Sequence, residues 1–258
     1  MPQATDKVGG HPGPPGRAGE TLVYPGRDLE AMSFAEKYHR WILQDFKPYM
    51  GARLVEVGAG TGSFSELLWE LRPESLTLVE PSAEMHDRLR ERVGAASRGV
   101  SVSTYNAFFR SVAEEIESTQ RPDSIIYVNV LEHIADDEGE LREVHRTLGP
   151  GGRVFIFVPA FQWLFGKFDE RVGHVRRYTR AELERKCVAA GFRVLESRYF
   201  DLAGVVPWWL KYRLFKSDSL DARTVELYDR FAVPLTRAAE SLIKPPIGKN
   251  IILIAERA

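Results

Sequence analysis

Three glycines and two acidic residues form the pattern in this chain with the clearest chemistry. The glycines are Gly58, Gly60 and Gly62, and the acids are Glu56 and Glu80. The apolar run before the glycines predicts a strand, and the glycines predict a turn whose backbone takes positive φ and puts no Cβ in the way of a ligand. A second apolar run ends at Glu80, whose carboxylate suits the two hydroxyls of a ribose. We therefore expect a nucleoside at these strand ends.

The spacing of the glycines selects among nucleoside cofactors. The dinucleotide fingerprint G-x-G-x-x-G would need a third glycine at position 63, where the chain has Ser63. The pattern Glu-x-Gly-x-Gly-x-Gly of residues 56–62 instead resembles motif I of the class I methyltransferases that depend on S-adenosylmethionine (SAM). That resemblance implies SAM as the cofactor, and Glu56 suits its ammonium and sulfonium charges. The alternative is a glycine turn that serves only strand-to-helix packing.

The resemblance extends to the sequences NVLEH at residues 129–133 and LGPGG at 148–152. It implies that Asn106 and Ala107 approach the adenine, although the family often has aspartate where Asn106 stands. It also implies that Asn129 and Val130 line the methionyl side of the cofactor. Further cofactor contacts are expected from Pro81, beside the ribose acid, and from Tyr38, on a helix before motif I. For Tyr38, packing against the sheet alone is an open alternative.

The end of the fourth expected strand bears on the methyl acceptor. Methyltransferases that act on base amines or glutamine amides carry an Asn- or Asp-Pro-Pro-aromatic turn there, which this chain lacks. The resemblance to enzymes with Leu-Glu-His at this place favours a small molecule, methylated at oxygen. Such a reaction needs alignment and removal of a hydroxyl proton. His133 and, further along, His174 are the expected catalytic residues, since imidazole titrates near neutral pH. A hydrogen-bonded spacer is the alternative for His133.

Two later segments are expected to form lids over the pocket. Residues 160–178 follow the fifth strand and therefore lie over the carboxyl ends of the sheet. Phe161, Trp163 and Tyr178 are expected to wall an apolar substrate, and Arg177 to meet an anionic group, with ion pairs that pin the loop as the alternative.

The second lid is the insertion at residues 201–247. Its tryptophans and basic residues at 205–216 resemble a membrane-interface helix, so a lipid-linked acceptor or membrane contact competes with burial of the tryptophans.

Composition limits the class of protein. The chain has 258 residues, 44% of them hydrophobic, and a net charge of −1, which suits one α/β domain and argues against an obligate nucleic-acid partner. Residues 1–20 are expected to be a disordered tail, because they are rich in Gly and Pro, and residues 21–258 a single domain. A single cysteine and the absence of a metal-ligand motif predict neither disulfides nor a metal site, in a cytoplasmic protein without a transmembrane segment. The oligomeric state stays open.

Strand-like and helix-like segments alternate along the chain, the pattern of a doubly wound parallel sheet. By resemblance, we expect the Rossmann-like seven-stranded methyltransferase sheet, with the last strand antiparallel between the fifth and sixth, helices on both faces and a helical lid insertion. Two other functions compete with methyl transfer. One is a nucleotide-cofactor oxidoreductase, which Ser63 argues against. The other is a SAM-binding partner protein without catalysis.

Overall fold

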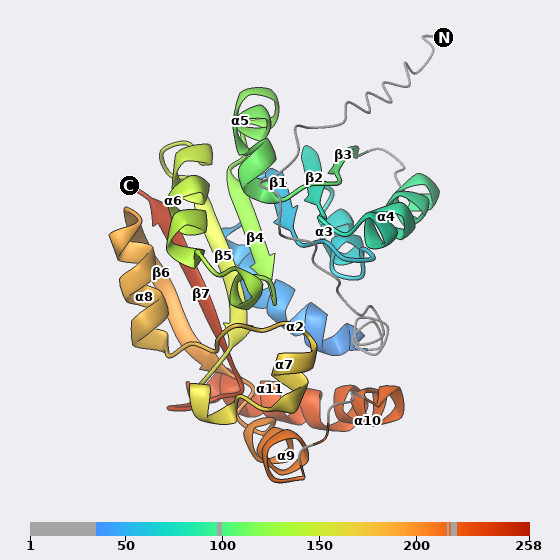
Figure 1. The fold of residues 1–258 in the computed structure, drawn as a ribbon, viewed down its shortest axis with the longest axis vertical. Coiled ribbons are helices and arrows are strands. Elements are labelled where there is room, and N and C mark those ends of the chain that lie inside the picture. Colours follow the sequence, from blue (N-terminus) through green and yellow to red (C-terminus); the bar gives the residue numbers. More distant parts are fainter. Residues whose placement is uncertain (1–34, 97–99, 216, 218–220) are drawn as a thin grey trace.

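The computed structural model describes residues 35–96, 100–215, 217 and 221–258, so the expected tail at 1–20 lies outside it. Seven strands form one sheet in the order β3-β2-β1-β4-β5-β7-β6 (Figure 1). The strands are β1 (Arg53–Val57), β2 (Ser75–Val79), β3 (Ser101–Tyr105), β4 (Ser124–Val128), β5 (Arg153–Pro159), β6 (Phe192–Phe200) and β7 (Asn250–Arg257).

The direction of the strands confirms the predicted topology. Strands β1 to β5 pair in parallel, and β7 lies antiparallel between β5 and β6. The strand order reverses between β1 and β4: β2 and β3 lie on one side of this pair, and β5, β7 and β6 lie on the other. The loops after β1 and β4 therefore run in opposite directions and leave a crevice at the carboxyl ends of these strands. This is the sheet of the class I methyltransferases.

Helices cover both faces of the sheet (Figure 1). They are α2 (Glu36–Phe46), α3 (Ser65–Glu70), α4 (Ala83–Ala96), α5 (Phe109–Gln120), α6 (Asp137–Thr147), α7 (Lys167–Arg171), α8 (Arg180–Ala189), α9 (Val205–Trp208), α10 (Ala222–Leu227) and α11 (Val233–Leu242). Alternate strand residues point to opposite faces, so Val55 packs with α5, α6 and α8, whereas Leu54 packs with α2, α3 and α4. The central strands β1, β2, β4, β5 and β7 are almost wholly buried, whereas the edge strands β3 and β6 are partly exposed.

The insertion between β6 and β7 forms a helical layer at one end of the sheet. It comprises α9, the π-helix Trp209–Leu214, α10, the π-helix Tyr228–Ala232 and α11, which gather beside α2 and α7 (Figure 1). The insertion completes α2, because the Asp229 carboxylate accepts hydrogen bonds from the backbone N–H groups of Lys37 and Tyr38, at 3.0 and 2.8 Å. These N–H groups have no partner within the helix, so Asp229 acts as its N-terminal cap.

The buried carboxylate of Asp201 fixes the start of the insertion. It accepts hydrogen bonds from Tyr38 Oη at 3.1 Å and from the Gly204 N–H at 3.0 Å, and it pairs with Lys249 Nζ at 2.9 Å. These partners come from α2, from the insertion and from the start of β7. The insertion is therefore fastened to the sheet at the edge where ligands bind in such folds. Across the described ranges, no helix has the length and apolarity to span a membrane.

Candidate active site

A cavity of about 780 Å³ opens at the carboxyl ends of β1, β2, β4 and β5. The glycine turn after β1 and the acid after β2 form one side of it. The loop after β4, the segment 160–178 and the start of the insertion form the other side. We call these the cofactor side and the acceptor side. Both sides belong to one continuous cavity, so ligands bound on each would be in contact.

The cofactor side is built mainly from backbone. Gly58, Gly60 and Gly62 have φ of +71°, +56° and +87°, as the glycine pattern predicts. The N–H groups of Gly58 and Ala59 donate to the carbonyl of Val79, at 2.8 and 3.1 Å, which ties the turn to β2. At Gly58 an added Cβ would lie 2.4 Å from a methyl of Val130, so this position has no room for a side chain.

The carboxylate of Glu80 holds the turn in place. One oxygen accepts the N–H of Gly60 and the other accepts the N–H of Ser82, each at 2.8 Å. A carboxylate oxygen has two lone pairs, so each oxygen of Glu80 keeps one for a hydroxyl in the cavity. Glu80 is 5% exposed, and burial raises its pKa while these two hydrogen bonds lower it.

Glu56 places a second buried acid in the cavity wall. Its carboxyl accepts a hydrogen bond from Ser65 Oγ at 2.5 Å and is otherwise surrounded by apolar groups and the glycine turn. Burial raises its pKa to about 8. A cationic ligand would reverse this effect, because an adjacent positive charge favours the ionised carboxylate. The wall therefore suits a cation such as the ammonium or sulfonium of SAM.

The acceptor side is built from charged side chains. Asp169 is fully buried and accepts a hydrogen bond from His174 Nδ1 at 2.7 Å. It also accepts from Arg177 Nε at 2.8 Å and from the Gly166 N–H at 2.9 Å. These hydrogen bonds and the charges of Arg177 and His174 hold the pKa of Asp169 below its usual value, although burial acts in the opposite direction. The ring of His174 is thus oriented by a carboxylate that is itself fixed.

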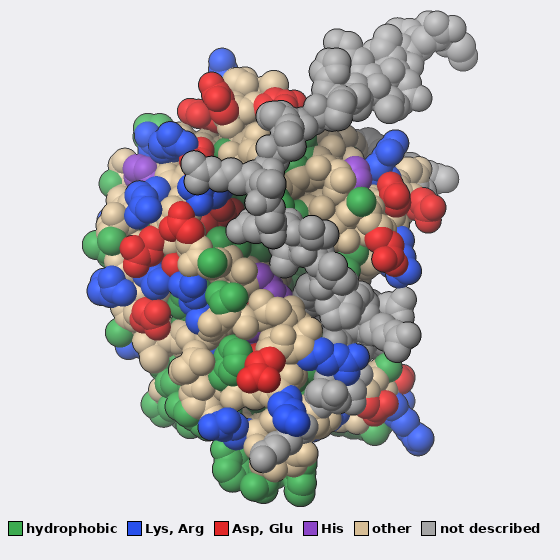
Figure 2. All heavy atoms as spheres, in the orientation of Figure 1, with side chains coloured by type: hydrophobic (Ala, Val, Ile, Leu, Met, Phe, Trp, Pro, Cys, Tyr) green, Lys and Arg blue, Asp and Glu red, His purple; other side chains and the backbone are tan. Residues whose placement is uncertain are grey.

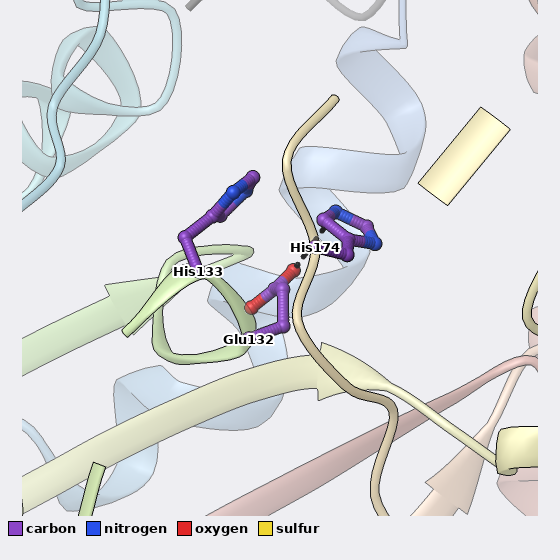
Figure 3. A group of neighbouring side chains, drawn as sticks. All are labelled: Glu132, His133 and His174. Carbon is purple, nitrogen blue, oxygen red and sulfur yellow. Dashed lines mark ion pairs between the residues drawn. The ribbon is translucent and has the colours of Figure 1, made fainter. Parts of the chain in front are cut away.

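Glu132, His133 and His174 lie together (Figure 3). The two histidines line the cavity. Glu132 and His133 belong to the short 3-10 helix Leu131–His133 after β4, and His174 comes from the segment 160–178. His174 Nε2 is 3.7 Å from a carboxylate oxygen of Glu132, and His133 Nδ1 is 3.2 Å from the carbonyl of Gly173. Burial raises the pKa of Glu132 to about 7 and lowers that of His133 to about 3.

The sequence predicts no metal site, whereas the structure brings three possible metal ligands together in this group. The donor atoms of Glu132, His133 and His174 all lie within 4.8 Å of one another, as metal ligands do before an ion draws them closer. No local motif signals the group, since His174 follows Glu132 by more than forty residues. Only the packing of the segment 160–178 against the β4 loop brings these side chains together.

Most of the predicted site residues line the cavity, and five do not. Those that line it are Tyr38, Glu56, Gly58, Gly60, Glu80, Pro81, Ala107, Asn129, Val130, His133, His174 and Arg177. Gly62 and Asn106 lie just behind the wall. The side-chain amide of Asn106 donates to the carbonyls of Glu80 and Pro81, at 3.0 and 3.2 Å, and so supports the backbone of the cofactor side.

The expected aromatic substrate wall needs correction. Phe161 stacks on Tyr199 with ring centroids 4.8 Å apart, and Trp163 is 48% exposed on the outer surface. Tyr178 is fully buried behind the site, where its hydroxyl donates to Asp137 at 2.7 Å. None of the three lines the cavity. The apolar wall on the acceptor side is instead formed by Phe157, Phe168, Val172 and Trp208.

Several cavity residues were not expected from the sequence. Glu132 and Asp169 lie directly behind the cavity wall, in contact with the ring of His174. Ion pairing of Asp169 is the alternative that the sequence offered for this segment, and the structure shows it with Arg177. Lys249 and Asn250 reach the cavity because β7 inserts next to β5, where the hydroxyl of Tyr38 donates to Asn250 Oδ1 at 3.0 Å. His39 also lines the cavity, and burial lowers its pKa to about 4.

Comparison with known proteins gives a consistent family. A family model described as a methyltransferase domain matches residues 30–197, more than half of the chain. A ubiquinone biosynthesis O-methyltransferase of Ruegeria pomeroyi is 30% identical over 106 residues, covering 41% of this chain and 40% of that protein. A protein of the same name from Rhizobium etli is 29% identical, covering 43% and 42%. The chain spans about two fifths of the length of these curated relatives.

Solved structures share the fold at low sequence identity. A SAM-dependent methyltransferase from Archaeoglobus fulgidus superposes with a TM-score of 0.56 at 18% identity, covering 88% of this chain and 98% of that one. A possible histamine N-methyltransferase from Thermotoga maritima gives 0.53 at 20% identity, covering 89% and 94%. At these identities the likeness concerns the fold.

Proposed function

Because the chain belongs to the methyltransferase domain family of SAM-dependent enzymes, we propose that it transfers a methyl group from SAM to an oxygen atom of a small-molecule acceptor. The observation that carries this proposal is the continuity of the cavity. A nucleoside site with two buried acids and a set of basic and acidic side chains lie on opposite walls of the same space. The names of the curated relatives support oxygen as the methylated atom.

The cofactor side suits SAM in three places. Glu80 has lone pairs left for the ribose hydroxyls, and Glu56 offers a carboxylate for the ammonium or sulfonium. Pro81 and Ala107 provide an apolar surface for the adenine ring, with Asn106 fixing the backbone beneath it. When bound, SAM supplies an electrophilic methyl group with a neutral thioether as the leaving group.

The acceptor side has to orient a hydroxyl and accept its proton. His174 is suited to this because Asp169 fixes its Nδ1 as the donor and directs Nε2 toward Glu132 and His133. His133 lines the cavity as well, and its lowered pKa keeps it neutral. The proton of the acceptor hydroxyl would thus leave through the group formed by Glu132, His133 and His174.

The acceptor is proposed to be apolar, with a lipid chain. Phe157, Phe168, Val172 and Trp208 wall the acceptor side, and two of the cations that line the cavity, Arg177 and Lys249, are already paired with Asp169 and Asp201. Outside the cavity, the insertion exposes apolar side chains, and Figure 2 shows hydrophobic atoms gathered along the lower edge, where α9 lies in Figure 1. Examples are Phe215, Phe231 and Leu235, at 75%, 58% and 74% exposure. Such a surface suits an acceptor presented from a lipid bilayer.

The proposal is tested with SAM labelled in its methyl group. The full chain is incubated with a panel of apolar phenols and alcohols, each offered free and in anionic vesicles, and labelled products are identified by mass spectrometry. We expect a methyl ether, formed faster from the vesicle-borne acceptor. Replacing Leu214 and Phe215 by serine, away from the cavity, should remove the advantage of vesicles and leave turnover of soluble acceptors unchanged. Labelled methylamine products would contradict oxygen as the methylated atom. Equal rates with free and vesicle-borne acceptors would contradict an acceptor presented from a lipid bilayer.

The rival function is a SAM-binding partner protein without catalysis. The cofactor side alone fits that function equally well, because Glu56 and Glu80 bear on binding only. The arrangement of Asp169 and His174 at the cavity favours catalysis, since an imidazole oriented by a buried carboxylate is a suitable base, although the same ion pairs also hold the segment 160–178 in place. If SAM binds but no acceptor in lysate becomes labelled, the partner function is the better account.

A further inference from the structure

We propose that Glu132, His133 and His174 form a binding site for one divalent transition-metal ion in the wall of the active-site cavity. The site itself stands on the geometry of these three side chains (Figure 3). Its role in the reaction deepens the function proposed above and rests on it. The chemical class of ligand is a borderline metal ion such as Zn²⁺, Co²⁺, Mn²⁺ or Fe²⁺, because two imidazoles and one carboxylate suit these ions.

The first observation is the state of the Glu132 carboxyl group. Glu132 is fully buried, and neither of its oxygens has a hydrogen-bond partner. His174 Nε2 lies 3.7 Å from one of these oxygens, which is too long for a hydrogen bond. A buried carboxyl group without hydrogen bonds is costly, and the great majority of buried polar groups are satisfied. A cation between Glu132 and the two imidazoles would satisfy it.

The second observation is that both imidazoles are oriented as metal ligands are. The Nδ1 atom of His174 meets the Asp169 carboxylate at 2.7 Å, and the Nδ1 atom of His133 meets the carbonyl of Gly173 at 3.2 Å. A carboxylate and a carbonyl only accept hydrogen bonds, so both Nδ1 atoms carry a proton, and in the neutral rings both Nε2 atoms carry a lone pair. Histidines that bind metals show this arrangement, with the second ring nitrogen donating to a carboxylate or a carbonyl.

The third observation is that the outer partners are themselves fixed. Asp169 is held by Arg177 Nε at 2.8 Å and by the Gly166 N–H at 2.9 Å. The N–H of Val175 donates to the carbonyl of Glu132 at 2.9 Å, which joins the His174 segment to the β4 loop. The three donor atoms, all within 4.8 Å, would approach to about 3.0–3.4 Å around an ion with bonds of about 2.1 Å.

The place of the site suggests its chemistry. His133 and His174 line the cavity, and Glu132 lies behind them, so a bound ion would turn its remaining coordination positions toward the acceptor. With the ion bound, His174 would be a metal ligand and no longer the base described above. An acceptor hydroxyl bound to the ion would then lose its proton to water more readily, because a metal ion lowers the pKa of a coordinated oxygen. The oxygen then forms a bond to the methyl carbon as the carbon–sulfur bond of SAM breaks, giving a methyl ether and the neutral thioether.

The proposal is tested by metal binding, measured without acceptor or turnover. Tag-free full chain is treated with EDTA, exchanged into metal-free buffer and titrated with Co²⁺, which is followed by its visible d–d absorption. A parallel titration uses Zn²⁺ and calorimetry. We expect one ion per chain and a loss of affinity of about tenfold or more in His174→Ala, His133→Ala and Glu132→Gln. The matched control is His145→Gln, whose histidine lies outside the cavity and should leave binding unchanged.

Folding of the variants is checked by their affinity for SAM, which lies on the other side of the cavity. If Glu132→Gln does not fold, the two histidine variants still decide the question. Absence of Co²⁺ and Zn²⁺ binding to the wild type, or equal binding in His174→Ala and His145→Gln, would overturn the proposal. Methyl transfer that persists in EDTA would contradict a role of the metal in the reaction but not the proposed methyl transfer. Metal binding without any methyl transfer would support the metal site and contradict the proposed function.

Discussion

The two sides of the cavity are built in different ways. On the cofactor side, consecutive residues of two adjacent strand ends make the site, and the backbone N–H of Gly60 is held by the Glu80 carboxylate twenty residues later. On the acceptor side, the site is assembled from the β4 loop, the segment 160–178, the insertion and β7, through side chains such as Asp169 and Lys249. The proposed SAM site therefore depends on local backbone geometry, whereas the proposed catalytic group depends on packing between distant segments.

The largest effect is expected from the turn of the cofactor side. Gly60→Val should weaken SAM binding by about 100-fold or more, because Gly60 has a φ of +56° and lines the cavity, and a β-branched residue there is strained and fills the site. The measurement is calorimetric titration with SAM, with circular dichroism to show that the sheet remains. A variant that stays folded and binds SAM normally would contradict the claim that the glycine turn forms the SAM site.

The next effect should appear on the acceptor side alone. His174→Ala removes the imidazole that Asp169 orients, so turnover should fall by about 100-fold, in the usual range for loss of an acid–base group. The affinity for SAM should change by less than about threefold, since His174 lies across the cavity from Gly60 and Glu80. Initial rates and calorimetry on the same preparation measure both. Equal losses in the two quantities would mean that the two sides are not separable.

Glu80→Ala sharpens the account of the cofactor side. The substitution removes the acceptor for the N–H groups of Gly60 and Ser82 and for the ribose hydroxyls. Each hydrogen bond to a charged group contributes about 1.5–3 kcal/mol, so the loss of even one ribose hydrogen bond should lower the affinity for SAM about 10- to 100-fold. Glu80→Gln, which keeps one acceptor, should fall between the wild type and Glu80→Ala. Unchanged affinity in Glu80→Ala would place the ribose elsewhere.

A smaller effect concerns pH and Glu56. Burial raises its pKa to about 8 from an ordinary value near 4.5, so the folded protein without SAM holds a proton there that the unfolded chain releases. The free energy of unfolding therefore falls as pH rises from 4.5 to 8.

Binding of cationic SAM favours the ionised form, so affinity should rise with pH, by up to about tenfold per unit, and level off above pH 8. Calorimetry in buffers of different ionisation enthalpy should show proton release on binding. Glu56→Gln should remove both dependences. A pH-independent affinity in the wild type would show that Glu56 is not in contact with the cationic part of SAM.

The smallest effect is expected from the corrected aromatic wall. Trp163 is 48% exposed and does not line the cavity, so Trp163→Ala should change turnover and SAM affinity by less than about twofold. Trp208→Ala is the contrasting variant, because Trp208 lines the acceptor side next to Phe168, with ring centroids 5.4 Å apart. Steady-state kinetics on the two variants would show whether the apolar wall lies where the structure has it. A large effect of Trp163→Ala would restore the wall expected from the sequence.

The same comparison explains how far the sequence could be interpreted. The alternation of strands and helices and the positive φ of the glycine turn follow from local patterns, and the structure confirms them. The antiparallel last strand followed from the family resemblance, and the structure confirms it too. The position of Tyr178 could not be predicted from such patterns. In the sequence, an aromatic residue at the end of a loop suits a cavity wall and a buried position behind the site equally well. Only the fold shows that the hydroxyl of Tyr178 pairs with Asp137, which Lys186 also approaches at 2.8 Å. Contacts between distant segments leave no periodic signal in the sequence.

The cap of α2 is a second example of this limit. Nothing near Tyr38 in the sequence indicates that Asp229, about 190 residues later, accepts its N–H. The group of Glu132, His133 and His174 has the same origin, since one member comes from a segment that packs on the other two. The sequence allowed each residue at a strand end to be interpreted by itself. Which of these residues come together in one site could be seen only in the fold.

One measurement tests the central claim most directly, namely that the strand ends of β1 and β2 hold SAM on one side of a shared cavity. It is the calorimetric titration of the folded wild-type chain with SAM and with its demethylated product. The account predicts one site per chain for each ligand, with heat that disappears in Gly60→Val and persists in His174→Ala. Absence of binding to the folded wild type, or loss of binding in His174→Ala alone, would contradict it.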